Sequence, residues 1–67
     1  MSRRHNTDNK KEFAARLKSY RMAHNMTQEQ LGRMLEASVF TINRWETAKH
    51  YPNASMLKLM KMLKIFS

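Results

Sequence analysis

The chain has 67 residues, no cysteine, and 13 Lys and Arg against five Asp and Glu, which gives a formal net charge of +8. A chain this short forms one small domain, and no disulfide or thiolate zinc site can support it. No apolar run approaches the roughly 20 residues of a membrane span, so we expect no membrane association through a spanning helix. The positive charge suits a polyanion such as nucleic acid or an acidic membrane surface.

One glycine, one proline and no alternating β-branched segments indicate an all-α fold. Residues 1–8 are expected to be a flexible basic arm ahead of a single domain over residues 9–67. Four basic side chains near this end could follow a nucleic acid or stay solvated: Arg3, Arg4, Lys10 and Lys11.

The first helix is expected to begin near Asn9, where Glu12 three residues later resembles a capping box. Phe13 and Leu17 lie on one face of this helix. Asn25 is a plausible stop, because Asn tolerates the left-handed conformation that ends helices.

A second helix follows over residues 28–35, with Thr27 as its N-cap and Gln30 completing a capping box. Its inner face is predicted to consist of Leu31, Met34 and Leu35. Gly32 costs roughly 1 kcal/mol relative to Ala in a helix, so its presence fits a close helix–helix approach.

Residues 36–38 are predicted to form a tight turn, and Ser38 caps a third helix that runs to about Thr47. Ile42 and Trp45 point inward with Ala37. The opposite side of this helix carries Val39, Phe40, Asn43 and Arg44.

A loop over residues 48–53 contains Pro52, which forbids a continuous helix there. The last helix is expected to begin between residues 53 and 55 and to run to the end of the chain. Its apolar stripe is Met56, Leu59, Met60, Leu63 and Phe66. The candidates for an exposed apolar patch, and so for a dimer seam, are Leu57, Met62 and Phe66.

Nothing in the sequence indicates catalysis. His5, His24 and His50 lie far apart, and no paired carboxylates, activated nucleophile or glycine-rich phosphate loop is present. We therefore expect no enzyme activity, no cofactor and no metal site.

Two capped helices joined by a three-residue turn, over residues 27–46, are typical of a helix-turn-helix that docks on DNA. Arg44 can donate two hydrogen bonds to guanine, Asn43 can pair with adenine, and Val39 and Phe40 can press on thymine methyl groups. The alternatives are that Val39 and Phe40 are core or dimer contacts, and that Arg44 contacts phosphate or lies at a solvated helix end.

The helix N-termini and the loop that follows the third helix are predicted to contact phosphates. Unpaired N–H groups and the helix dipole favour an anion at a helix start. The predicted phosphate contacts are Thr27, Gln28, Ser38, Thr41, Lys49, His50 and Tyr51. The other interpretation of Thr27 and Ser38 is capping alone.

Residues 13 to about 65 resemble the Cro/C1-type repressors, the lambda-repressor-like or XRE family of helix-turn-helix domains. The runs that carry the resemblance are LKSYRMAHNMTQEQLGRML, SVFTINRWE and AKHYP. The resemblance implies a compact bundle of four or five helices that binds operator DNA, usually as a two-fold dimer. It also implies an ion pair between Arg21 and Glu46.

The sequence departs from the family pattern at two turns and on the outer side of the third helix. Glu36 and Ala48 stand where the family usually has Gly, so a left-handed conformation there would carry a strain of about 1 kcal/mol. The first outward residues of the third helix are apolar where Gln, Arg or Ser is common.

The leading hypothesis is a sequence-specific transcriptional regulator of the repressor type, located with the nucleoid in the cytoplasm, that binds double-stranded DNA as a homodimer. One alternative is an antitoxin-type module with a toxin as protein partner and autoregulatory DNA binding. Another is a non-specific binder of nucleic acid or of an anionic membrane.

Overall fold

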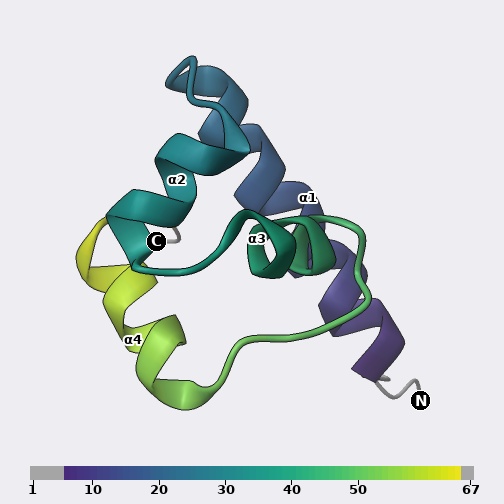
Figure 1. Cartoon of the computed structure of the whole chain (residues 1–67). Coiled ribbons are helices and arrows are strands. Elements are labelled where there is room, and N and C mark those ends of the chain that lie inside the picture. Colours follow the sequence, from purple (N-terminus) through teal and green to yellow (C-terminus); the bar gives the residue numbers. More distant parts are fainter. Residues whose placement is uncertain (1–5, 66–67) are drawn as a thin grey trace.

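The computed structural model describes residues 6–65, with residues 6–9 described by their backbone alone. This part of the chain contains four helices and no strand: α1 (Asn6–Ala23), α2 (Gln28–Leu35), α3 (Val39–Glu46) and α4 (Ala54–Met62). α3 packs against α1 and α2, and α4 packs against α2 (Figure 1). The predicted all-α fold is confirmed. No helix of the described part is long and apolar enough to cross a bilayer.

The hydrophobic core lies where the helices converge, and every helix contributes to it. Its buried members are Phe13, Leu17, Leu31, Leu35, Ile42, Trp45, Met60 and Ile65. Burial of one such side chain stabilises the fold by about 1.5–3 kcal/mol. The core therefore fixes one side of α3 against α1 and α2 and leaves the opposite side unoccupied by the fold.

A residue in the left-handed conformation follows the end of each of the four helices by one or two positions, and none of these residues is glycine. They are Asn25, Glu36, Ala48 and Lys64, with φ between 55° and 65°. After α3, the Ala48 N–H donates to the Trp45 carbonyl at 3.3 Å and the Lys49 N–H donates to the Arg44 carbonyl at 2.9 Å. This paired bonding satisfies the last carbonyls of the helix and turns the chain back.

The one glycine of the chain, Gly32, allows the turn after α2 to fold back onto that helix. A Cβ atom at this position would lie 2.5 Å from the Ala37 carbonyl oxygen. The Ala37 N–H also donates to the Gly32 carbonyl at 2.8 Å. The predicted close approach exists, but its partner is the backbone of the turn rather than another helix.

The start of α1 differs from its prediction. α1 begins at Asn6, so Asn9 and Glu12 lie inside the helix and do not form its N-terminal capping box. Residues 6–8 are helical, and the first five residues of the predicted arm, with Arg3 and Arg4, lie outside the described residues.

The end of α4 also differs from its prediction. The helix stops at Met62, because the left-handed Lys64 reverses the chain and the Ile65 N–H donates to the Met60 carbonyl at 3.0 Å. The reversal buries Ile65 in the core. Leu57 packs against the core and is not exposed as predicted, whereas Met62 is exposed. Phe66 lies outside the described residues.

Candidate nucleic-acid interface

The two helices of the motif begin with complete side-chain caps. Thr27 Oγ1 accepts from the Gln30 N–H at 3.0 Å, and Gln30 Oε1 accepts from the Thr27 N–H at 2.8 Å. Ser38 Oγ accepts from the Thr41 N–H at 3.1 Å and lies 3.0 Å from Thr41 Oγ1. Both predicted caps are confirmed. α3 has no acid in its first turn, so its dipole remains uncompensated there and favours an anion.

α3 carries apolar side chains on two opposite sides. Ile42 is fully buried and Trp45 is 7% exposed, as predicted for the inner side. On the outer side Phe40 is 67% exposed and Val39 is 44% exposed. Asn43 is exposed beside them. The interpretation of Val39 and Phe40 as core contacts is therefore wrong, and these side chains remain accessible to a partner.

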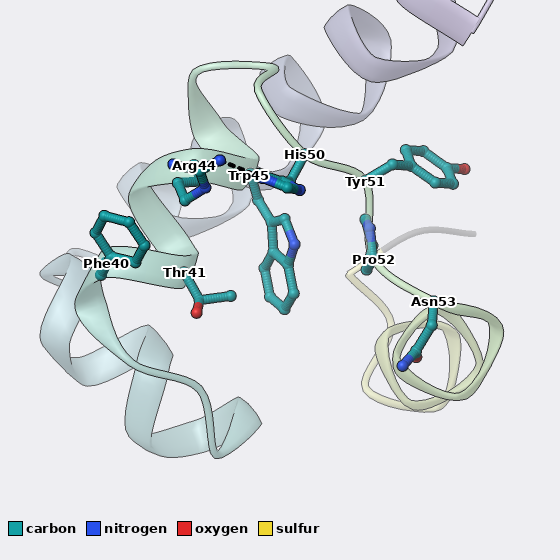
Figure 2. A pocket seen from close by; sticks show the side chains of 8 residues that line it. All are labelled: Phe40, Thr41, Arg44, Trp45, His50, Tyr51, Pro52 and Asn53. Atoms are coloured by element: carbon teal, nitrogen blue, oxygen red, sulfur yellow. Dashed lines mark hydrogen bonds between the residues drawn. The ribbon is translucent and has the colours of Figure 1, made fainter.

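Arg44 is held in a defined position on the outer side of α3. Its guanidinium carbon lies 5.1 Å from the centroid of the Phe40 ring, and its Nη2 is hydrogen-bonded to His50 Nε2 (Figure 2). A guanidinium has only donors, so His50 Nε2 is the acceptor of this hydrogen bond. Arg44 is thus a half-buried side chain with two intramolecular partners, and its contact with base or phosphate stays a prediction.

An open hollow of about 390 Å³ lies between α3, the loop over residues 47–53 and the start of α4 (Figure 2). It is lined by Phe40, Thr41, Arg44, Trp45, His50, Tyr51, Pro52 and Asn53. Asn53 Oδ1 caps α4 by accepting from the Met56 N–H at 2.9 Å. The sequence placed the start of a helix near Asn53, but gave no signal that this cap lies beside α3.

The loop after α3 brings the three predicted phosphate contacts into different surroundings. His50 turns back toward Arg44. The centroid of the Tyr51 ring lies 5.3 Å from that of the Phe13 ring of α1, and Tyr51 is partly exposed and is one of the residues that line the hollow. Lys49 is exposed. The loop therefore supplies a cation and a phenol at the surface, while His50 is engaged with the neighbouring helix.

The ion pair implied by the family resemblance is present and ties α1 to the end of α3. Arg21 Nε donates to Glu46 Oε2 at 2.6 Å, and Arg21 Nη2 donates to Glu46 Oε1 at 3.0 Å. The Glu46 side chain is only 3% exposed. The hydrogen bond to Glu46 raises the pKa of Arg21, burial opposes this, and the Glu46 charge raises it further. The pair is a bidentate, charge-assisted contact.

Gln28, the first residue of α2, joins this ion pair. Its Nε2 donates to Glu46 Oε1 at 3.1 Å. A side-chain amide has two N–H donors, and this bond uses one of them. The sequence indicated Gln28 as a phosphate contact but did not indicate that Glu46 would hold its side chain.

The site thus consists of the accessible Val39, Phe40 and Asn43 on α3, the positioned guanidinium of Arg44, and three helix starts that are capped by side chains. Among the described residues, no group of three or more His, Asp or Glu side chains is placed to hold a metal ion.

Comparison with known proteins identifies the family. The family model described as Helix-turn-helix (HTH_3) matches residues 17–65. The chain is also 43% identical over 56 residues to the HTH-type transcriptional activator BcrR of Enterococcus faecalis. That alignment covers 84% of this chain and 26% of the relative, so the chain spans about a quarter of the relative's length. No solved structure matches. The chain belongs to the helix-turn-helix family of DNA-binding domains found in XRE-type transcription regulators.

Proposed function

We propose that this chain binds double-stranded DNA sequence-specifically, with α3 in the major groove, and regulates transcription. The observation that carries the proposal is the outer side of α3. There Val39, Phe40 and Asn43 are exposed, and the first turn of the helix has no acid. The net charge of +8 supports binding to a polyanion. Family membership supports double-stranded DNA as that polyanion.

The proposed base contacts follow from side-chain chemistry. Asn43 can bond to adenine N6 and N7, and Arg44 can donate to guanine O6 and N7. Val39 and Phe40 have no polar atoms, so the thymine methyl group is their natural contact. All four project from the outer side of one two-turn helix, which suits the width of the major groove.

The proposed phosphate contacts lie around the four proposed base contacts of α3. They are Thr27 and Gln28 at the start of α2, Ser38 and Thr41 at the start of α3, and Lys49, His50 and Tyr51 in the following loop. Glu46 holds one N–H of Gln28, so the remaining N–H is available to a phosphate oxygen at a fixed position. Such contacts set the orientation of α3 in the groove and carry no sequence information.

We propose binding as a homodimer, whose half-sites would lie about 34 Å apart on one face of the DNA. Of the residues predicted for a dimer seam, Met62 at the end of α4 is accessible to a second copy. The relative carries the name of an activator. The same DNA-binding domain can serve activation or repression of transcription, and our proposal therefore covers both.

The test is in vitro selection of DNA from a random pool, followed by gel-shift titration of the selected and a scrambled duplex. We expect a consensus with two-fold symmetry and tighter binding to the selected duplex. Affinity should fall steeply with salt, with a logarithmic slope of about −0.9 for each phosphate neutralised. Equal binding to selected and scrambled DNA would contradict sequence-specific recognition.

A further inference from the structure

We propose that Phe40 and Arg44 act as one paired reader, which recognises a guanine together with a thymine in the adjacent base pair. This inference rests on the proposed DNA-binding function and deepens it. It adds that the two recognised bases lie in neighbouring base pairs, and that the His50 side chain holds Arg44 in position.

The first argument is the separation of the two groups. Phe40 and Arg44 are four residues apart on α3, so they lie one above the other on the same side of the helix (Figure 2). The guanidinium carbon lies over the ring, 5.1 Å from its centroid. Successive bases rise by about 3.4 Å along one DNA strand. An offset stack of this spacing therefore matches two neighbouring base pairs better than a single base pair.

The second argument is the chemistry of the two partners. A guanidinium that donates to guanine O6 and N7 lies near the plane of that base. A ring stacked on this guanidinium then lies at the level of the next base pair, with its edge toward the groove floor. Phe40 has no donor or acceptor, so it satisfies a thymine methyl group and leaves the polar edges of other bases without partners. The contact of the guanidinium with the ring is a cation–π interaction, which becomes stronger when a bound partner excludes water from it.

The third argument is that Arg44 is held in position in the protein without DNA. His50 Nε2 accepts a hydrogen bond from Arg44 Nη2, and the backbone N–H of His50 donates to the backbone carbonyl of Arg44 at 3.3 Å. These bonds leave most guanidinium N–H donors available for a base. Holding a flexible side chain before binding lowers the entropy lost on binding. His50 is therefore a positioning residue for Arg44.

The experiment uses the 67-residue chain and the duplex recovered by in vitro selection. Each thymine is replaced singly by deoxyuridine, which lacks only the methyl group, and each guanine by 7-deazaguanine, which lacks N7. In each half-site we expect a thymine, beside any that contacts Val39, at which deoxyuridine weakens binding by about fourfold, the value for loss of one buried methyl group. The adjacent base pair should contain the guanine whose replacement weakens binding most.

Variants then assign each base to its side chain. F40A should bind the thymine and deoxyuridine duplexes equally, and R44A should lose the sensitivity to 7-deazaguanine. M22A, which truncates an exposed apolar side chain on α1, should keep both sensitivities. H50A should reduce the sensitivity to 7-deazaguanine, and H50Q should restore part of it because its amide oxygen can accept from Arg44.

Three outcomes would overturn the paired reader while the proposed function stands. They are an F40A variant that keeps every thymine preference, a thymine whose sensitivity depends on Phe40 but that is not adjacent to the sensitive guanine, and an R44A variant that keeps its sensitivity to 7-deazaguanine. An H50A variant with unchanged sensitivity would overturn the positioning role. A selection that yields no consensus would instead contradict the proposed function, and the paired reader with it.

Discussion

The inner and outer sides of α3 are both apolar, yet the fold uses only one of them. Ile42 and Trp45 on the inner side are buried against the other helices, whereas Val39 and Phe40 on the outer side face solvent. An eight-residue helix with apolar residues on both sides would ordinarily be enclosed by its own domain. The difference indicates that the outer residues contribute little to folding and are available for recognition. Substitutions on the inner side of α3 should therefore lower the stability of the protein, whereas substitutions on the outer side should change its DNA binding.

The largest expected effect concerns the ion pair at the inner end of α3. R21M leaves the buried carboxylate of Glu46 without its charged partner, and the free energy of unfolding should fall by about 3–5 kcal/mol. The matched control is R33M, which removes an ion pair to Glu29 on the solvent side of α2. Both side chains of that pair are largely exposed, so its loss should change stability by about 0.5 kcal/mol or less. Urea denaturation measures both changes, and equal effects would contradict the role of burial.

A second substitution pair compares the two sides of α3 directly. I42A removes a fully buried side chain and should lower the free energy of unfolding by about 2–5 kcal/mol. V39A, on the outer side, should stay within about 0.5 kcal/mol of the wild type. Thermal denaturation followed by circular dichroism distinguishes the two variants. A V39A variant destabilised as strongly as I42A would mean that the outer side belongs to the core.

Gly32 tests the contact between α2 and the turn that leads into α3. G32A places a Cβ 2.5 Å from the Ala37 carbonyl oxygen, and the backbone must shift at a cost of about 1–3 kcal/mol. In an unhindered helix the same substitution would stabilise the protein by about 1 kcal/mol. The sign of the change in urea denaturation therefore decides whether the close contact exists.

The smallest expected effect concerns the residue that ends α3. Ala48 has φ 62°, a conformation that costs an L-residue about 1–2 kcal/mol, so A48G should raise stability by about 1 kcal/mol. A15G, at an exposed position within α1, should lower stability by about 1 kcal/mol. Destabilisation by both glycines in calorimetry would show that Ala48 is not strained.

The features that could be predicted from sequence arise from local chemistry. The caps at Thr27 and Ser38 each bond to a backbone N–H three residues later, so a short stretch of sequence contains both partners. The left-handed conformations at Glu36 and Ala48 agree with the family resemblance, which indicated a positive φ and some strain at these two positions. The inner side of α3 follows from helical spacing alone.

The features that could not be predicted depend on chain reversals and on contacts between helices. The apolar stripe of α4 continues past Met62 in the sequence, and only the left-handed Lys64 directs Ile65 back into the core. The bond from Gln28 to Glu46 joins residues 18 positions apart and requires α2 and α3 to be docked. Similarly, His50 reaches Arg44 only because the chain turns back at Ala48.

The central claim is that the outer side of α3 reads the base sequence. Repeating the in vitro selection with N43A and R44A tests it most directly. We expect each variant to recover a consensus that has lost its preference at one or two base pairs and kept the others, because direct readout relaxes specificity locally. An unchanged consensus, or uniform weakening on every sequence, would contradict the claim.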